Sequence, residues 1–433
     1  MIWIKDKLNE LKSSDYVQNV ATLATGTTIA QLISVGSAPV LYRIYSKEDY
    51  GTLGTYMAIV SVIGVFSTLR YNEAIILEKD DKDAKIVLWL NRYINIIFTF
   101  ICVIGVYIIN GWICTLLNND QLRVWLYFMP ISIFFGGQNE IFKIWANRKK
   151  EYRILTINAV LMALIVPFVS ICIGVFNSGP IGLFLGLLIG QVTPAIILHF
   201  SLSRKYNLKK TSEINYETIK RFANRHRDFP FYSLPSDFIN RLTQQLPIFM
   251  LSTLFGASIV GVYNLCTRML AIPMQLISSS VASIFRERAT YDFNTYGNSF
   301  SIFRKTTITL LLISIIPFTI LIFSAPFLFE LFFGQKWRMA GEFAQILTPM
   351  FFFNFIVSPL TYMYYIVNKQ KEDFIGHLIL LVTTFIIFYF IGNSNNVNSL
   401  LLYFSLSYCV FYIIYYFRSL QFSNGLVRTS KRL

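Results

Sequence analysis

The stretch Ile86–Ile109 reads IVLWLNRYINIIFTFICVIGVYII, and Arg92 is its one charged residue. An α-helix rises 1.5 Å per residue, so a run of this length crosses the hydrocarbon core of a bilayer, which is about 30 Å thick. Lys79, Lys82 and Lys85 precede the run, and a short predicted loop, Asn110–Gln121, follows it. The stretch therefore predicts a transmembrane helix with a basic flank.

The composition of the whole chain agrees with a lipid environment. Of its 433 residues 55% are hydrophobic, 16% are aromatic and only 14% are charged, whereas soluble domains carry about 25% charged residues. This excludes a single soluble enzyme domain and a disordered chain. No G-x-x-x-x-G-K-[ST] motif is present, so no P-loop ATPase is fused to the chain. The five cysteines lack metal-ligand spacing, and we expect no cofactor beyond a coupling H⁺ or Na⁺.

Comparable apolar runs recur along the chain and predict about twelve transmembrane helices. The first six lie near Val17–Tyr42, Gly51–Leu77, Ile86–Ile109, Leu122–Ala146, Ile154–Phe176 and Ile181–Ser201. The second six lie near Phe231–Phe255, Gly261–Phe285, Thr306–Phe333, Glu342–Val367, Phe374–Ile391 and Ser399–Phe417.

The placement of Lys and Arg predicts the orientation of these spans. With the N-terminus inside, 28 of the 38 basic residues fall in cytoplasmic segments and only Arg43, Lys47, Lys336 and Arg338 fall on the opposite side. Positively charged loops stay cytoplasmic, so both termini are expected inside. The net charge of +15 then reflects orientation and attraction to anionic lipid, without any need for nucleic acid.

A long basic segment divides the chain into two halves. We expect an amphipathic helix over residues 1–16 on the inner leaflet, an N-lobe over 17–202, a cytoplasmic linker over 203–230, a C-lobe over 231–417 and a cytoplasmic tail over 418–433. Gly54-Thr55-Tyr56 and Gly261-Val262-Tyr263 open the second and eighth spans, as in transporters built from parallel repeats. The predicted fold class is an all-α polytopic membrane protein with two six-helix lobes around a central cavity.

Charged side chains within the spans are the candidate functional residues. Each costs about 2.5–3.5 kcal/mol at a helix centre, so it should face protein or water. Helical spacing places three pairs on shared faces, namely Arg70 with Glu73, Glu140 with Lys143, and Asp237 with Arg241. Arg268 lies nearer mid-span and has no acid in reach by sequence.

These charges have two interpretations. They form neutralised structural ion pairs or snorkelling residues, or the arginines bind phosphate oxygens through bidentate, charge-assisted hydrogen bonds. In the second interpretation the neighbouring acids relay protons, bind a coupling cation or prevent over-tight anion binding. We favour the second interpretation for Arg70, Arg241 and Arg268, because an ionisable residue inside a membrane marks a functional site by default.

Two stretches of the chain carry extended motifs. Residues 24–74 carry a G-x-x-x-A-Q face, then Pro39, Arg43, Tyr45, Asp49, Tyr50 and Gly51 of the pattern P-x-x-x-R-x-[YF]-x-x-x-[DE]-[YF]-G, and the L-R-Y-x-x-A-I-x-L segment over 69–77. Residues 228–289 carry an F-P-x-Y-S-L-P…Q-Q-L-P segment, followed by G-x-Y-x-x-x-x-R. Both stretches resemble the corresponding segments of bacterial Wzx-type oligosaccharide flippases.

The resemblance implies membership of the multidrug/oligosaccharidyl-lipid/polysaccharide exporter superfamily and a V-shaped cavity with alternating access. It implies a flippase that moves undecaprenyl-pyrophosphate-linked glycan, such as an O-antigen unit of lipopolysaccharide biosynthesis, from the cytoplasmic to the periplasmic leaflet of the bacterial inner membrane. A polysaccharide polymerase and a chain-length regulator are the protein partners that we expect. The implied substrate-binding residues are Arg70, Arg241, Arg268, Lys143 and Arg43, with Glu73, Glu140 and Asp237 for coupling or charge relay.

Other functions give other expectations. A drug/cation antiporter of the same superfamily should have a net acidic site, whereas the embedded residues here are rich in arginine. A membrane polysaccharide polymerase typically needs a sizeable periplasmic loop, and the longest predicted outside loop is only Asn110–Gln121. A structural scaffold would not need arginines in mid-span. We therefore expect a transporter rather than an enzyme.

Overall fold

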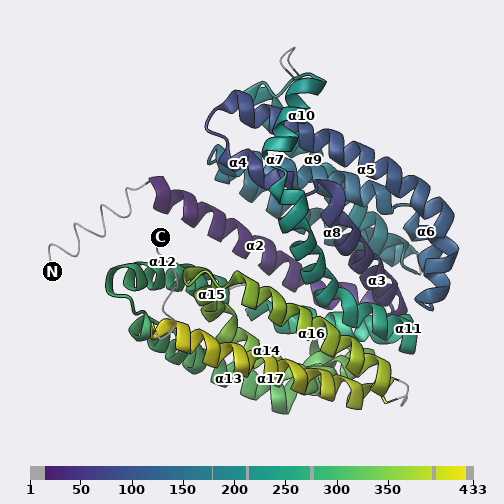
Figure 1. Cartoon of the computed structure of the whole chain (residues 1–433). Helices are drawn as coiled ribbons and strands as arrows, with labels where there is room; N and C mark the ends of the chain where they lie inside the picture. Colours follow the sequence, from purple (N-terminus) through teal and green to yellow (C-terminus); the bar gives the residue numbers. More distant parts are fainter. Residues whose placement is uncertain (1–14, 178, 211–213, 274–276, 393–395, 426–433) are drawn as a thin grey trace. The chain divides into compact units, whose positions relative to one another are not determined.

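The computed structural model describes residues 15–177, 179–210, 214–273, 277–392 and 396–425, which fold into helices joined by short turns (Figure 1). No β-strand occurs among these residues, and the predicted all-α class is confirmed. The chain divides into two compact units, Met1–Arg241 (unit 1) and Leu242–Leu433 (unit 2). The predicted helix over 1–16 falls almost wholly outside the described residues, as does the end of the predicted tail, 426–433.

Unit 1 is built on six long helices and three short ones. α8 packs against α2 and α9, while α7 packs against α5 and α9. A capping box in which Ser46 and Asp49 bond each other's backbone N–H fixes the start of the second long helix. The helices are α2 (Asp15–Ile44), α3 (Lys47–Gly64), α4 (Ala74–Leu77), α5 (Asp81–Leu116), α6 (Leu122–Leu126), α7 (Met129–Arg148), α8 (Tyr152–Phe176), α9 (Ile181–Tyr206) and α10 (Tyr216–Arg225).

Unit 2 continues from α11 (Leu234–Pro273), whose first turns belong to unit 1. Gly256 has φ +78°, a conformation that interrupts the helix and that only glycine adopts without strain. α14 packs against α13 and α17, and α16 packs against α17. The remaining helices are α12 (Ser279–Tyr296), α13 (Phe300–Phe333), α14 (Arg338–Val357), α15 (Met363–Ile366), α16 (Gln370–Ile391) and α17 (Val397–Ser423).

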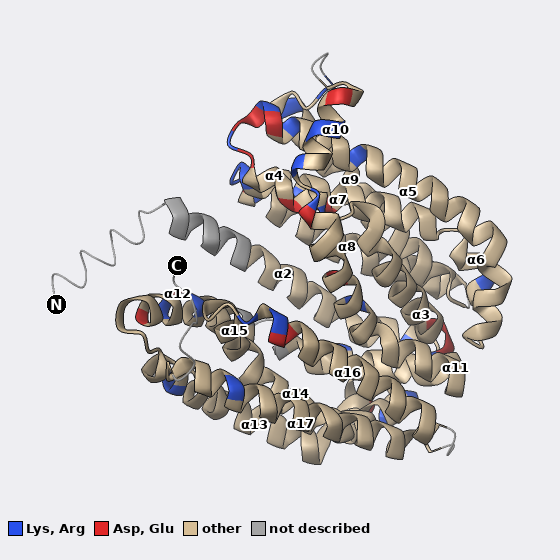
Figure 2. Cartoon of the chain, viewed as in Figure 1, with Lys and Arg blue, Asp and Glu red and all other residues tan. Residues whose placement is uncertain are grey.

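The helix lengths agree with about twelve spans. Within the described ranges, nine helical segments are long and apolar enough to cross a membrane. Dividing α11 at Gly256 and adding α2, with 30 residues, and α7, with 20 residues, gives twelve. Figure 2 shows long uncharged stretches between the charged ends of these helices. Exposed side chains such as Phe100 and Tyr107 on α5 and Phe323 on α13 suit contact with lipid.

One predicted span is interrupted. The sequence predicts a single helix over Gly51–Leu77, but α3 ends at Gly64 and is followed by two 3₁₀ turns, Val65–Ser67 and Tyr71–Glu73, before α4. The interruption leaves backbone groups free of helical bonds, and non-helical backbone at membrane depth is tolerated where it lines protein or a wet cavity. The broken span becomes important below, because it carries Arg70.

Small residues bring α8 and α9 into close contact. Gly182, Gly186 and Gly190 recur every fourth residue on α9. A Cβ atom on Gly186 would lie 2.1 Å from Ser170 Oγ and 2.7 Å from the carbonyl oxygen of Val166, so a larger residue has no room. This is the small-residue packing that holds membrane helices together where no hydrophobic effect drives them.

Tyr45, between α2 and α3, anchors the same contact. Its side chain is buried and its hydroxyl donates a 2.6 Å hydrogen bond to the carbonyl oxygen of Ser170. We expect Tyr45→Phe to lower the free energy of unfolding by about 1 kcal/mol, the usual contribution of one such bond. Chemical unfolding of the purified protein measures this, with the exposed Tyr403→Phe as the control. Equal stability of the two variants would contradict the role given to Tyr45.

Candidate functional site

The interrupted span places Arg70 at a strained backbone position. Leu69 and Arg70 have φ values of +47° and +63°, the left-handed region that costs a non-glycine residue about 1–2 kcal/mol. A side-chain hydrogen bond of 3.0 Å from Thr68 to Asn72 spans the turn, and Asn72 is buried. The surrounding fold therefore holds the turn in place. Strain of this kind concentrates at binding and switch sites.

Four charged side chains of unit 1 meet at this turn, and we call them the Arg70 cluster: Arg70, Glu73, Asp237 and Arg241. The Arg70 guanidinium lies 3.5 Å from a Glu73 carboxylate oxygen and 3.5 Å from an Asp237 carboxylate oxygen. Asp237 also lies 3.8 Å from Arg241 Nε, one turn further along α11. The cluster thus joins the turn that follows α3 in the interrupted span to the start of α11.

The cluster is partly open to solvent. The Arg70 and Asp237 side chains are 31% and 18% exposed, while Glu73 and Arg241 are more open. Arg70 Nε is buried and has no hydrogen-bond partner within the described part of the chain. Two bases face two acids, so the cluster has no net charge when all four are ionised. An incoming anion must therefore compete with Glu73 and Asp237 for the guanidinium groups.

The other predicted site residues have different surroundings. Lys143 pairs with Glu140 at 3.7 Å on α7, and both side chains are exposed. Arg43 is exposed in the last turn of α2. Arg268 belongs to unit 2, is exposed on the second half of α11, and has no acid within 4 Å among the described residues. Within unit 1, the structure therefore brings together four of the seven predicted residues that this unit contains.

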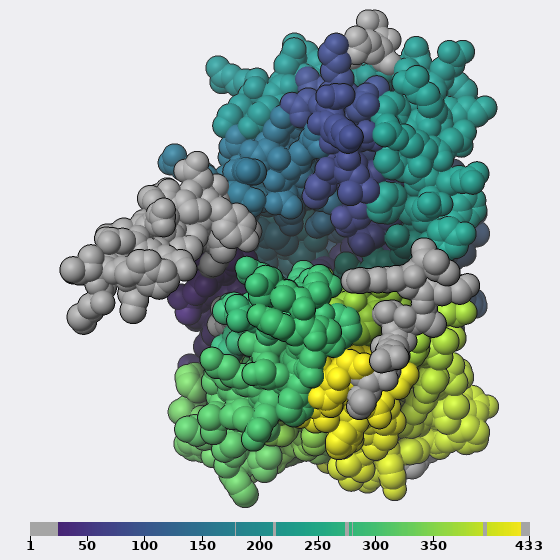
Figure 3. Space-filling view, turned by 60° about the vertical axis from the view of Figure 1, so that its left-hand side comes forward, coloured from purple at the N-terminus to yellow at the C-terminus, as the bar shows by residue number. Residues whose placement is uncertain are grey.

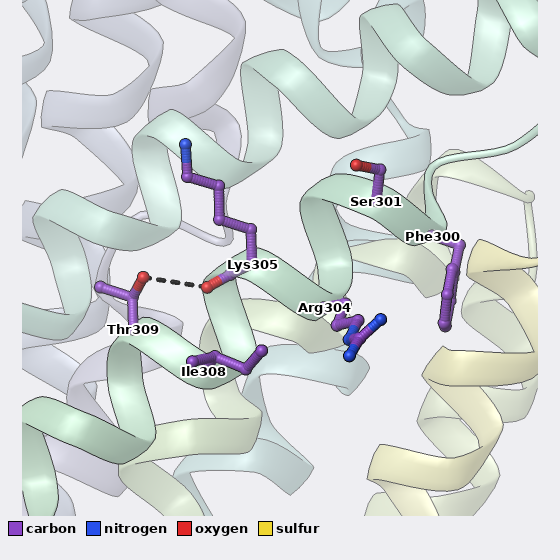
Figure 4. Close-up of a pocket in the computed structure, with 6 residues that line it drawn as sticks. All are labelled: Phe300, Ser301, Arg304, Lys305, Ile308 and Thr309. Carbon is purple, nitrogen blue, oxygen red and sulfur yellow. Dashed lines mark hydrogen bonds between the residues drawn. The ribbon is translucent and has the colours of Figure 1, made fainter.

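A pocket of about 400 Å³ lies elsewhere, along the first three turns of α13 in unit 2 (Figure 4). The side chains of Arg304 and Lys305 leave the helix in different directions, and the Thr309 hydroxyl donates to the Lys305 carbonyl oxygen at 2.9 Å. None of the predicted site residues lines this pocket, so it is not the candidate site. Its lining residues are Phe300, Ser301, Arg304, Lys305, Ile308 and Thr309.

A second charged group, missed from sequence, lies beside the cluster. The Glu78 side chain is only 2% exposed, and its carboxylate contacts His226 at 2.5 Å and Arg225 at 3.3 Å. Both residues belong to the basic segment 203–230, which the sequence identifies only as a cytoplasmic linker. One feature of the sequence could have indicated this group, since Glu78 directly follows the apolar residues Ala74–Leu77. A glutamate that is buried there needs a partner for its charge.

Arg148 is the other residue that sequence reasoning undervalued. Its guanidinium donates to the carbonyl oxygens of Ile75, Ile76, Glu78 and Lys79, and it also bonds Asp81. It therefore satisfies the free carbonyl groups at the end of α4, as basic residues do at helix C-termini. From sequence it counts only as an orientation signal.

Arg92 lies on α5, within the predicted transmembrane stretch Ile86–Ile109, and contacts aromatic rings. Its guanidinium stacks over the Trp89 ring with 4.4 Å to the centroid and lies 5.8 Å from the Phe142 ring. Aromatic faces attract a cation that has been removed from water. Across the described ranges, no three His, Cys, Asp or Glu side chains are grouped so that they could hold a metal ion.

The helical units and the broken charged span define the class of the protein: it has the fold of multidrug/oligosaccharidyl-lipid/polysaccharide exporter superfamily transporters. The lipid II flippase MurJ in an inward closed conformation superposes with a TM-score of 0.71, over 92% of this chain and 89% of that chain, at 15% identity. A superfamily transporter from Pyrococcus furiosus superposes with a TM-score of 0.61, over 96% of this chain and 98% of that chain, at 13% identity. These identities show the fold alone.

The sequence shows the family. The model of the polysaccharide biosynthesis protein family matches residues 40–342, and the chain belongs to that family. The succinoglycan biosynthesis transport protein ExoT of Rhizobium meliloti (strain 1021) is 20% identical over 326 residues, which cover 73% of this chain. The aligned stretch spans 61% of that relative's length. The superfamily expected from the residues around Arg43 and Arg70 is thus confirmed.

Proposed function

We propose that this protein is a flippase that moves undecaprenyl-pyrophosphate-linked oligosaccharide from the cytoplasmic to the periplasmic leaflet of the bacterial inner membrane by alternating access. The observation that carries the proposal is the Arg70 cluster, where Arg70 of the interrupted span and Arg241 of α11 remain partly open to solvent. Guanidinium groups bind phosphate oxygens in pairs, which suits a diphosphate head. A head group with many hydroxyls cannot cross about 30 Å of hydrocarbon unaided.

The acids of the cluster explain how the head group would be released again. A diphosphate that binds Arg70 and Arg241 replaces the carboxylates of Glu73 and Asp237, so one set of ion pairs is exchanged for another. The net gain in free energy is then small, and the site does not trap its substrate. The released carboxylates, with Glu140 further along the same unit, are the groups that would take up a coupling H⁺ or Na⁺.

The balanced charge of the cluster also separates the proposal from its main alternative. A drug/cation antiporter would present excess carboxylate to its cargo, whereas each acid of the cluster here contacts an arginine. Arg268 adds a base in unit 2. Cytoplasmic termini, a polysaccharide polymerase and a chain-length regulator as partners belong to the same proposal, supported by the distribution of Lys and Arg and by the family.

A leaflet-accessibility assay in proteoliposomes tests the proposal with labelled undecaprenyl-pyrophosphate oligosaccharide. We expect Arg241→Ala and Arg268→Ala each to slow translocation about tenfold, because each removes a charge-assisted bond of about 1.5–3 kcal/mol. Arg153→Ala, at an exposed position on α8 with no acid within 4 Å among the described residues, is the control for net charge. Normal rates in both variants would contradict the cationic site, and no movement by the wild type would contradict the flippase.

A further inference from the structure

The described part of the predicted linker, including α10, belongs to unit 1 and packs on the rest of it. Phe222 of α10 is buried in a core that includes Ile75, Val87 and Trp145, and the Tyr71 hydroxyl donates to the carbonyl oxygen of Ala223 at 3.1 Å. Figure 3 shows blue-violet and teal segments of unit 1 next to each other on the face in view. The linker therefore contacts the same interrupted span that carries Arg70.

Two contacts between charged or polar side chains join segment 70–78 to segment 226–237. From Arg70 the chain runs through α4 to Glu78, and from His226 it runs through Phe229–Ser233 to Asp237. Glu78 pairs with His226 at 2.5 Å, and Arg70 pairs with Asp237 at 3.5 Å. The two contacts are eight positions apart on the first segment and eleven on the second. A displacement of either segment therefore changes both contacts. We call the Glu78–His226 contact the linker clamp.

The clamp has a defined charge environment. On the linker side, Arg225 contacts the second Glu78 oxygen at 3.3 Å, and the Phe229 ring lies 6.3 Å from the His226 ring. On the α7 side, the Arg148 guanidinium bonds the Glu78 carbonyl oxygen and is itself paired with Asp81. Glu78 is therefore held at two points, by Arg225 and His226 at its carboxylate and by Arg148 at its backbone carbonyl oxygen.

We infer that Glu78 and His226 are positioning residues for the Arg70 cluster, and that the contact between them holds Asp237 against Arg70. The inference rests on the proposed function for its meaning in transport. An intact clamp favours the internal Arg70–Asp237 pair, which competes with an anion. Loss of the clamp loosens both segments and makes Arg70 available, so a variant without the clamp should bind a diphosphate head more tightly than the wild type.

Hydrogen exchange of the full chain in lipid nanodiscs, without substrate, tests the clamp by itself. We expect the protection factor of segment 65–78 to be about tenfold lower in His226→Gln than in the wild type, the effect of losing one charge-assisted contact. His226→Arg, which keeps a charged donor opposite Glu78, should restore the high value. His377→Gln, which alters a histidine 3.6 Å from Asp373 in unit 2, should behave as wild type.

Three outcomes would overturn the inference: no effect of His226→Gln, no recovery in His226→Arg, or an equal loss of protection in α8, which would mean general destabilisation. Glu78→Gln gives a second, independent variant and should match His226→Gln. Because the measurement needs no substrate, its failure is distinct from failure of the flippase. Undecaprenyl pyrophosphate binding to the same proteins then tests the link to transport, with a lower Kd expected for His226→Gln than for the wild type and a Kd equal to that of the wild type for His226→Arg.

Discussion

Arg70→Ala is expected to slow translocation of the labelled lipid-linked oligosaccharide about 100-fold while the protein remains folded. Arg70 is the one arginine of its cluster that contacts both acids, and it is presented by a turn that the fold holds in a left-handed conformation. A bidentate contact to phosphate supplies two charge-assisted bonds of about 1.5–3 kcal/mol each. Their loss corresponds to at least two factors of ten, each worth about 1.4 kcal/mol.

Arg70→Lys separates charge from geometry in the same assay. The ammonium group keeps the charge but lacks the planar fork, so we expect an intermediate loss of about tenfold. Arg153→Ala again controls for net charge. If Arg70→Ala and Arg153→Ala translocated equally well, the Arg70 cluster would be a structural ion-pair network only, and the substrate site would have to lie elsewhere.

Gly341→Ala should have the largest effect on stability, about 3 kcal/mol, at the upper end for overpacking. A Cβ atom on Gly341 would lie 2.4 Å from Pro326 Cα and 2.5 Å from the carbonyl oxygen of Ala325. These are backbone atoms of α13, so no side-chain rotation relieves the clash, and α13 and α14 must move apart. Chemical or thermal unfolding in detergent measures the loss.

The matched control for this substitution is Gly105→Ala. Gly105 lies in the interior of α5 and has no heavy atom within 4 Å of the added Cβ position. Alanine is also the better helix former, so this variant should be as stable as the wild type or slightly more stable. Equal destabilisation at both positions would show that the contact between α13 and α14 is not tight.

Local charge pairing was predictable from spacing. The pairs Glu140–Lys143 and Asp237–Arg241 form on their helices as the three- and four-residue spacings predict, at 3.7 and 3.8 Å. Arg70 and Glu73 also pair, but the predicted reason was wrong, because the span is interrupted there and they do not share one continuous helix face. Leucine and arginine rarely adopt the left-handed conformation that glycine, asparagine and aspartate favour. The residue types at positions 69 and 70 therefore do not predict the break in the span.

Contacts between distant segments were not predictable in the same way. Nothing in the spacing pairs Arg70 with Asp237 or Glu78 with His226, because each pair joins segments separated by most of unit 1. The positive charge of the linker predicts the same orientation whether the linker is free or docked. Its docking is visible only in the structure, in the burial of Phe222 and in the contacts of Glu78 with Arg225 and His226.

The sequence by itself determined the lipid environment, the approximate number of spans and the superfamily, because hydrophobic length and helical periodicity act within short segments. Only the tertiary structure decided which charges meet, where a span breaks and how closely glycine-bearing helices approach. Those features depend on packing between segments far apart in the chain. The unfavourable free energy of a buried charge or a strained turn is offset by contacts with neighbouring side chains. Those neighbours come from distant parts of the sequence, so a local pattern does not identify them.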